Sequence, residues 1–310
     1  MMLELRDIEY FVKIAETGNV GRAAVALGLS QPALSKSLRR LEAELQTKLV
    51  KKVAKGIELT TVGTAFLAQV RRIRLSLEDV SHEVADLCQG RAGHLRIGCG
   101  PDMVDFLVQR ACDAFLKIAP KATFSVQVAI NDVLFPALRT GVHDLIVSEL
   151  PPSPDEDFIH EYLMDDEFCV FASARHRVAR QKRATMAELA QQQWAMTTPN
   201  ALSRLKLVRA FEDHGLALPK IIFETNSLPL ILRMVATSDL LGFVSKRVVR
   251  TADPKLHLAE LQVEGATWPR RVGMSYRKDA YISPAAQQFI EILKATAKSI
   301  ASPGRTSATL

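Results

Sequence analysis

A run of apolar residues spaced alternately by four and three positions occupies residues 66–87 and dictates much of the organisation of the chain. Its members are Phe66, Val70, Ile73, Leu77, Val80, Val84 and Leu87. A repeat of 3.5 residues indicates the seam of a coiled coil rather than the wider stripe of a helix lying on a globular core. We therefore expect a helix over residues 61–90 that pairs two copies of the chain through these dimerisation contacts. The alternative is a helix that packs on its own chain.

Positive charge is concentrated near the N-terminus. Residues 1–75 hold 13 Lys and Arg against 7 Asp and Glu, whereas residues 76–310 hold 27 of each. Between residues 36 and 55 the count is seven basic side chains against two acidic ones. Such a surplus is typical of surfaces that bind the phosphates of nucleic acids, although a solvated basic helix face has the same composition.

The first 45 residues have the pattern of a helix-turn-helix. Apolar residues at helical spacing predict a first helix that ends at Gly18, and a short second helix follows over residues 22–27. Ser30 is suited to cap a third helix, with Pro32 in its first turn. On this helix Leu34, Leu38, Leu41 and Leu45 share a stripe that faces the core. The opposite side carries Pro32, Ser35, Lys36, Arg39 and Arg40, a polar and cationic face suited to the major groove.

Two short β-prone runs follow the third helix. Residues 49–53 and 57–59 flank Ala54-Lys55-Gly56, which predicts a hairpin with a lysine at its tip. Such a hairpin is a wing. It can lay Lys52 or Lys55 along the phosphates or into the neighbouring minor groove.

Together these elements resemble the DNA-binding domain of LysR-type transcriptional regulators. The resemblance is carried by Arg22-Ala23-Ala24, by Leu27-Gly28-Leu29-Ser30-Gln31-Pro32-Ala33-Leu34-Ser35, by Leu41-Glu42 to Leu45, and by Leu59-Thr60-Thr61-Val62-Gly63. The chain departs from the family at Asn19 and Gly21, where Ser and Thr are usual, and at Val50-Lys51-Lys52, where Phe-x-Arg is frequent.

The resemblance implies which residues approach DNA. They are Ser30, Gln31, Pro32, Ser35, Lys36 and Arg39. Gln31 and Lys36 are expected at base edges, since Gln pairs with adenine and Lys donates to guanine. Ser30 and Ser35 are expected at phosphates, and Ser30 can also cap its helix. Arg40 either contacts DNA or pairs with a glutamate on its own helix.

Beyond a polar break at residues 90–93, strands and helices alternate, which predicts an α/β domain with parallel sheets. The expected strands cover residues 94–98, 124–130, 144–148, 168–173, 194–197, 221–224, 241–244 and 271–276. The expected helices lie near residues 102–118, 132–140, 203–214, 228–237 and 284–300.

The resemblance extends more loosely over this region and implies two Rossmann-like subdomains of the periplasmic-binding-protein type. The expected division is a winged helix-turn-helix over 1–60, a linker helix over 61–90, an effector-binding domain over 91–300 and a flexible tail over 301–310. Subdomain I takes residues 94–164 and 268–300, and subdomain II takes residues 165–267. The chain then crosses between the subdomains twice, which makes a hinge.

In such folds ligands bind beyond the carboxyl ends of the strands, near helix N-termini. This places the expected effector contacts at Gly100, Pro101, Asp102, Met103, Asn131, Thr197, Thr198, Asn200, Asn226 and Phe243. Each such residue alone is also an ordinary turn or cap residue. As a set they predict a small polar or anionic effector, and the family favours a carboxylate. Asp102 and Glu149 oppose a simple anion site, because each would repel a carboxylate unless paired.

Other classes of protein fit the sequence poorly. A dinucleotide-binding fingerprint begins at Gly98-Cys99-Gly100 but fails at Met103, where Gly or Ala is required. A possible serine-nucleophile motif, Ser203-Arg204-Leu205-Lys206, lacks its companion motifs, so Ser203 is interpreted as a helix cap. The histidines form no metal-ligand cluster, and no cofactor is expected. Four scattered cysteines are expected to be reduced thiols, although a redox-sensing pair is conceivable. With neither a signal peptide nor a long apolar stretch, we expect a cytoplasmic protein that does not contact membranes.

The resulting prediction is a LysR-type regulator that is not an enzyme and whose action on DNA is modulated by a small-molecule effector. Its expected partners are double-stranded promoter DNA, the effector and further copies of itself as a homodimer or homotetramer, with RNA polymerase as an additional candidate. The alternative is a solute-binding or weakly catalytic α/β domain whose N-terminal helices serve only dimerisation.

Overall fold

The chain folds into two compact units, Met1–His82 and Glu83–Leu310. The computed structural model describes residues 4–54, 56–89, 94–153 and 155–301, apart from the side chains of residues 72, 75, 76, 78, 79, 81–83 and 85–89. Within this described part, every helix is too short or too polar to cross a lipid bilayer.

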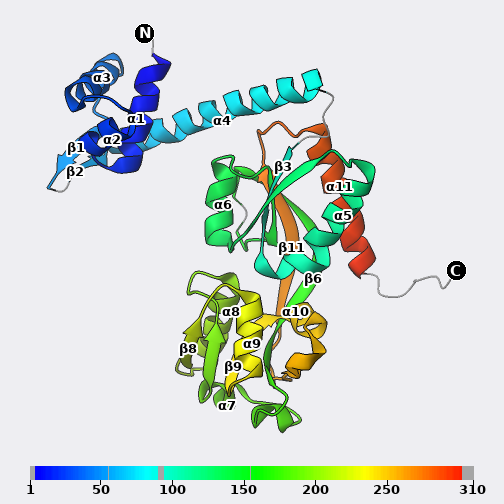
Figure 1. Cartoon of the computed structure of the whole chain (residues 1–310). Helices are drawn as coiled ribbons and strands as arrows, with labels where there is room; N and C mark the ends of the chain where they lie inside the picture. The colour runs from blue at the N-terminus through cyan, green and yellow to red at the C-terminus, as the bar shows by residue number, and fades with distance from the viewer. Residues whose placement is uncertain (1–3, 55, 90–93, 154, 302–310) are drawn as a thin grey trace. The chain divides into compact units, whose positions relative to one another are not determined.

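The first unit is a winged helix-turn-helix (Figure 1). Its elements are α1 (Leu5–Thr17), α2 (Val20–Ala26), α3 (Gln31–Glu44), the antiparallel hairpin of β1 (Val50–Val53) and β2 (Gly56–Leu59), and the start of α4 (Thr61–Gln89). Gly18 ends α1 in the left-handed conformation with φ of 62°, which costs glycine little. Ser30 and Pro32 begin α3 as the sequence predicts.

The leucine stripe of α3 faces the core of this unit, as predicted. Leu34, Leu38 and Leu41 are buried there against Phe11 of α1, and Leu45 packs at the edge. Because the stripe fixes the rotation of α3 about its axis, the opposite face of the helix is directed to solvent.

The second unit is built on one mixed sheet. Its strands are β3 (His94–Cys99), β4 (Thr123–Val128), β5 (Leu145–Glu149), β6 (Phe158–Ser173), β7 (Gln193–Met196), β8 (Lys220–Glu224), β9 (Leu240–Ser245), β10 (Leu258–Glu260) and β11 (Trp268–Arg277). Their order is β4-β3-β5-β11-β6-β9-β7-β8, with β10 paired to β6. The two long strands β6 and β11 are antiparallel and pair from Trp268 opposite Phe168 to Arg277 opposite Phe158. They form a ribbon shared by both halves of the sheet.

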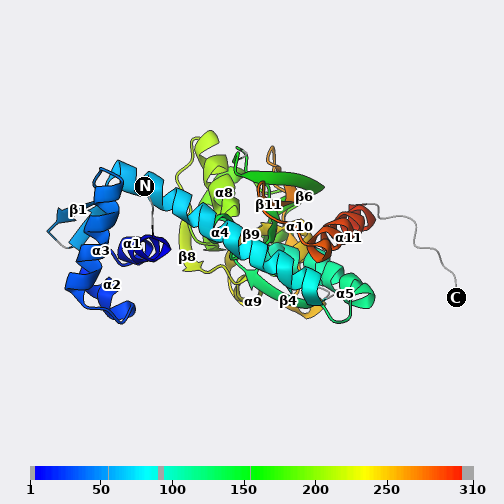
Figure 2. The same cartoon turned by 90° about the horizontal axis from the view of Figure 1, so that it is seen from above.

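Helices cover both faces of each half of the sheet. In the first half, α5 (Gln109–Ile118) and α11 (Pro284–Ala301) lie side by side on one face (Figures 1 and 2), and α6 (Asn131–Arg139) packs on the other. In the second half, α7 (Met186–Ala190) and α8 (Leu202–Asp213) cover one face, and α9 (Leu228–Ala236) and α10 (Lys246–Thr251) cover the other. The predicted combination of a winged helix-turn-helix with an α/β domain is therefore confirmed.

Three expectations need correction. The predicted helix near residues 102–118 is interrupted: a short 3-10 turn, Pro101–Met103, and a π-helical turn, Val104–Val108, precede α5. Strand β6 begins at Phe158, ten residues before the predicted strand, because polar and acidic residues interrupt its apolar pattern. The sheet is mixed rather than parallel, since β6 and β11 run antiparallel to their neighbours.

Candidate functional site

Helix α3 presents the predicted DNA-contacting residues on the side opposite its buried leucines. Gln31, Pro32, Lys36 and Arg39 are exposed, and Ser35 is half-buried. Ser30 is exposed as well, and its hydroxyl accepts a weak hydrogen bond of 3.4 Å from the amide of Ala33. The helix can therefore offer amide, ammonium and guanidinium donors to a groove.

Arg40 differs from these residues because its guanidinium is already engaged within the unit. Its Nε lies 2.6 Å from Oδ2 of Asp7, and its Nη2 lies 2.5 Å from Oδ1. The hydroxyl of Ser37 donates to the same carboxylate at 2.5 Å. Of the two alternatives for Arg40, pairing within the protein is the one seen, but the partners are Asp7 of α1 and Glu4, the residue before α1, rather than a glutamate of α3.

The hydrogen bonds from Arg40 also explain why the buried Asp7 has a lowered pKa. The sequence did not predict that Asp7 is buried. Asp7 is buried, with 3% of its surface exposed. The guanidinium of Arg40 holds the pKa of Asp7 below its ordinary value of 3.8, and the Ser37 hydroxyl acts in the same direction against the effect of burial. The only sequence signal was a polar residue on the apolar side of α1.

The wing is attached to α3 by a second buried carboxylate. Glu42 accepts hydrogen bonds from the amide of Leu49 at 3.0 Å and from the ammonium of Lys48 at 2.6 Å. Lys52 on β1 is exposed, as a phosphate contact would require. Lys55, the predicted tip residue, lies outside the described residues.

The heptad residues of α4 divide into two groups. Phe66 and Val70 pack into the core of their own unit, and the ring of Phe66 lies 5.4 Å from that of Phe11. In contrast, Ile73, Leu77, Val80 and Val84 are between 53% and 55% exposed. The side chain of Leu87 lies outside the described residues. Beside this apolar face α1 and α4 enclose a groove of about 330 Å³ lined by Leu5, Ile8, Val12, Val70 and Ile73 among others.

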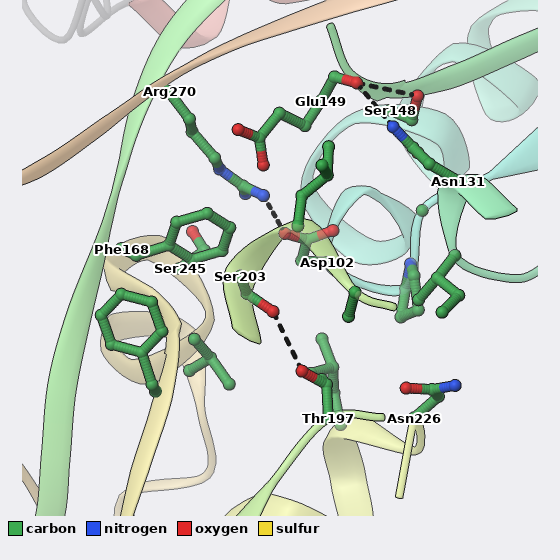
Figure 3. A pocket seen from close by; sticks show the side chains of 18 residues that line it. Asp102, Asn131, Ser148, Glu149, Phe168, Thr197, Ser203, Asn226, Ser245 and Arg270 are labelled. Atoms are coloured by element: carbon green, nitrogen blue, oxygen red, sulfur yellow. Dashed lines mark hydrogen bonds and ion pairs between the residues drawn. The ribbon is translucent and has the colours of Figure 1, made fainter. Parts of the chain in front are cut away.

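In the second unit a narrow cavity of about 60 Å³ opens between the two halves of the sheet (Figure 3). Seven of the ten predicted effector contacts line it: Gly100, Pro101, Asp102, Asn131, Thr197, Asn226 and Phe243. They come from the carboxyl ends of strands and from the adjoining helix starts, as expected for this kind of fold.

The other three predicted contacts lie outside the cavity lining. Met103 is fully buried in the core of the first half. Thr198 donates to the amide oxygen of Asn226 at 3.1 Å and so supports a lining residue. Asn200 is exposed, and its amide nitrogen lies 3.3 Å from a carboxylate oxygen of Asp132.

The most buried charge in the cavity is Arg270, near the start of β11. Its guanidinium forms ion pairs with Asp102 and Asp166, with Nη2 lying 2.5 Å from Oδ2 of Asp166 (Figure 3 shows the contact with Asp102). It also stacks 4.3 Å from the ring centre of Phe168. Burial alone would lower the pKa of Arg270, but the two aspartates outweigh that effect and raise it, so that it stays charged.

A second ion pair lies in the same wall. The ammonium of Lys206 lies 2.7 Å from Oε1 of Glu149 and donates to the carbonyl of Pro269 at 3.0 Å. Burial raises the pKa of Glu149, although Lys206 opposes the shift. The lining cation Arg270 and the adjoining cation Lys206 are thus each matched by carboxylates of the protein.

Several lining residues escaped the sequence prediction, notably Ser148, Phe168, Ser245 and Arg270. Phe168 and Ser245 lie within apolar strands, where nothing in the pattern separates a lining residue from a core residue. Arg270 follows Trp268-Pro269 where the apolar pattern resumes, which is a weak signal of a buried charge. Ser203 does not cap α8, since Ala201 holds that position; its hydroxyl lies 3.1 Å from that of Thr197.

Among the described residues, no group of three or more His, Cys, Asp and Glu side chains could hold a metal ion. Cys99, Cys112 and Cys169 are free thiols, and burial raises the pKa of Cys112 to about 11 and that of Cys169 to about 12. The side chain of Cys88 lies outside the described residues.

Comparison with known proteins links both units to one family. Residues 5–64 match the family described as "Bacterial regulatory helix-turn-helix protein, lysR family", and residues 89–298 match "LysR substrate binding domain".

The chain is 28% identical to the "HTH-type transcriptional regulator GbpR" of Azospirillum brasilense over 94% of this chain and 86% of that protein. It is 30% identical to the GbpR protein of Rhizobium radiobacter over 81% of this chain and 86% of that protein. A solved structure, "Crystal structure of full-length CbnR complexed with the target DNA complex", covers 95% of this chain and 100% of its own, with a TM-score of 0.62 at 21% identity.

Proposed function

This chain belongs to the LysR family of transcriptional regulators, and from that premise we propose that α3 and the wing bind promoter DNA while the cavity between β5, β9 and β11 binds an uncharged polar effector. The chain has the family's DNA-binding and effector-binding domains. The DNA it contacts, the class of its effector and its assembly are our proposals.

The observation that carries the DNA-binding proposal is the solvent face of α3. Gln31, Lys36 and Arg39 are exposed there together, and no ion pair holds them within the described part of the chain. The structurally similar CbnR protein has been crystallised with its target DNA, which supports duplex DNA as a ligand of this chain. Duplex DNA is thus the ligand that best fits a helix bearing donors on its exposed side.

The test replaces Lys36 with alanine in the full-length chain and measures affinity for a duplex selected from random DNA by the wild-type protein. Loss of a phosphate contact lowers the slope of log K against log salt by about 0.9, and loss of a base contact costs about 1–3 kcal/mol. Lys13→Ala is the matched control, because Lys13 is a partly exposed lysine of α1 that pairs with Glu16 at 3.3 Å. Equal affinities and salt slopes for both variants would contradict the proposal.

The effector proposal follows from the charge balance of the cavity. Arg270 and Lys206 are each matched by protein carboxylates, so a carboxylate effector would enter without a free cation and would meet Asp102 and Glu149. The remaining lining offers the amides of Asn131 and Asn226, serine and threonine hydroxyls, and the rings of Phe168 and Phe243. An uncharged molecule with hydroxyl or amide groups and one apolar face satisfies this lining at the lowest desolvation cost. The carboxylate that the family resemblance favours stays a prediction, and it is the alternative to this proposal.

A thermal-shift panel tests the effector class with the full-length protein. A bound ligand raises the melting temperature in proportion to RT ln(1 + [L]/Kd). We expect stabilisation by a neutral polyol, sugar or amide, and none by monocarboxylates of similar size. Stabilisation by monocarboxylates but not by the neutral compounds would contradict the proposal for the effector and would leave the proposal for DNA binding unaffected.

For assembly, we propose that the exposed apolar residues Ile73, Leu77, Val80 and Val84 of α4 pair with a second copy of the chain. Further association into a tetramer, contact with RNA polymerase, a cytoplasmic location and the absence of catalysis complete the proposal. Analytical ultracentrifugation of Ile73→Glu and Val80→Glu variants tests the pairing, because buried charges in the seam would dissociate the dimer.

A further inference from the structure

The loop between β6 and α7 carries a dense group of cations that the proposed function does not use. Within nine residues it exposes Arg175, Arg177, Arg180, Lys182 and Arg183, and we call residues 175–183 the basic loop (Figure 1, beside the α7 label). The rest of the unit, residues 83–310 outside this loop, holds 22 Lys and Arg against 25 Asp and Glu. The basic loop is thus a local reversal of charge on a unit that is otherwise acidic.

The charge of the basic loop is not neutralised by the part of the chain that the structure describes. In the described part of the chain none of its five cationic side chains forms an ion pair. One neighbouring carboxylate, Glu188, is engaged in the capping box of α7 with the N-cap residue Thr185: it accepts from the amide of Thr185 at 2.9 Å and from Gln181 at 3.2 Å. Arg177 only contributes to lowering the pKa of Glu188 from a distance.

The backbone beneath these side chains is firmly held. The amide of Ala174 donates to the carbonyl of His257 at 2.7 Å, and the amide of Ala184 donates to that of Gln262 at 2.8 Å. Inside the loop the buried ring of His176 accepts from the amide of Val178 at 3.1 Å. The basic loop is therefore a fixed platform that presents long side chains, so that binding a ligand would order only those side chains.

The residues around the basic loop indicate which kind of anionic partner it suits: a protein, a single-stranded nucleic acid or a duplex. Between Tyr162 and Leu205 the described residues include no exposed large hydrophobic side chain. Protein interfaces usually depend on buried aromatic or apolar anchors, which are missing here. The loop also exposes no aromatic ring on which the bases of a single strand would stack, because the ring of His176 is buried. Binding the phosphate backbone of duplex DNA requires neither apolar anchors nor stacking rings, and guanidinium groups are suited to bind its phosphates.

We propose that the basic loop is a second, sequence-independent contact site for the phosphate backbone of double-stranded DNA, distinct from α3 and the wing. It relies on the DNA binding proposed above, because the loop would contact DNA that flanks the site held by the first unit. Tethering raises the local concentration of that flanking DNA, so weak contacts add to the overall affinity.

The test compares full-length wild type with the triple variant Arg175→Ala/Arg177→Ala/Arg180→Ala on two duplexes. One duplex is limited to the selected binding site, and the other extends it by thirty base pairs on each side. On the long duplex we expect the salt slope of the triple variant to fall by about 2 to 3, since each lost phosphate contact removes about 0.9. On the short duplex the two proteins should bind alike, which separates this proposal from the role of α3.

The matched control, Arg233→Ala/Lys278→Ala/Lys298→Ala, removes the same charge from three exposed and dispersed positions of the same unit. It should leave both slopes unchanged, and melting temperatures establish that both variants are folded. Equal slopes for the loop variant and the control on the long duplex would overturn the proposal. So would a loop variant that binds both duplexes normally but no longer binds purified RNA polymerase, because the partner would then be a protein.

Discussion

Arg40 of α3 and Asp7 of α1 form a two-point ion pair in which a nearly buried carboxylate receives both Nε and Nη2 of a guanidinium that is 41% exposed. The pair connects the proposed recognition helix to the first helix of the chain. Since α3 carries the proposed base contacts, the Asp7 carboxylate helps to set the orientation of those contacts. Any role of Arg40 at DNA itself stays a prediction.

Replacing Asp7 with asparagine should loosen α3. The variant keeps the size of the side chain but leaves Arg40 without its main partner, at a cost of about 1–3 kcal/mol. Because the pKa of Asp7 is held below 3.8 in the fold, this stabilisation is complete above pH 3.8 and is lost as the pH falls through the folded value. Amide hydrogen exchange across residues 31–44 measures the effect, with Glu16→Gln as an exposed control on α1. Unchanged exchange in the Asp7 variant would show that the pair is not a significant tether.

Gly63→Ala should disrupt the junction between the wing and α4. A methyl group at Gly63 would lie 1.9 Å from the carbonyl oxygen of Leu49 and 2.9 Å from its carbonyl carbon. Both are backbone atoms, so the first turn of α4 would have to move, which costs about 1–3 kcal/mol or more. Thermal unfolding followed by circular dichroism should show the loss, whereas Thr64→Ala at an exposed neighbour should behave as wild type. A Gly63→Ala protein as stable as the control would refute this packing.

Asp102→Asn should convert the cavity into an anion site. The substitution removes one of the two carboxylates that match Arg270, and leaves Asp166 as its remaining partner. We expect a monocarboxylate to raise the melting temperature of this variant but not that of wild type. Asp144→Asn, which breaks an ion pair of 2.6 Å with Arg96 outside the cavity, is the control and should resemble wild type. Carboxylate stabilisation of wild type and variant alike would contradict the proposed charge balance.

The second unit should lose stability in mild acid because of His143. This residue is 3% exposed, and burial lowers its pKa below the ordinary value of 6.5, with Asp144 opposing the shift. The unfolded chain therefore takes up a proton first, so stability is complete above pH 6.5 and falls as the pH drops towards the folded value. Urea unfolding between pH 5 and 7.5, followed by tryptophan fluorescence, should show a flatter profile for His143→Leu than for wild type. The exposed control His214→Gln should keep the wild-type profile.

The sequence predicted those features that depend on local pattern. Ser30 and Pro32 mark the start of α3, Gly18 marks the end of α1, and the leucine stripe determines which side of α3 is exposed. Each of these depends on neighbours within a few positions along the chain. The prediction of an α/β second domain succeeded for the same reason, since alternating strands and helices leave a periodic apolar pattern.

The features that the sequence did not predict depend on contacts between distant residues. Asp7 meets Arg40 across 33 positions, and Asp166 meets Arg270 across 104. Such partners leave no local signal, so Arg270 could not be recognised as a cavity residue, and Phe66 and Val70 could not be separated from the exposed heptad residues. The early start of β6 at Phe158 was missed because acidic residues interrupt the apolar pattern there. These residues still form part of the strand, because they pair with β11 along its length.

The ribbon of β6 and β11 has a mechanical consequence. Both strands pass through both halves of the second unit and are paired over ten residues of β11, so the halves cannot be pulled apart or slide without breaking a ladder of backbone hydrogen bonds. The soft deformation left to such a two-stranded element is torsion about its own axis. The irregularity between Val272 and Gly273, where a side chain at 273 would lie 2.5 Å from the carbonyl oxygen of Glu161, marks the point at which that torsion would concentrate. A ligand in the cavity would then twist the two halves of the second unit relative to each other about this ribbon, rather than draw them together.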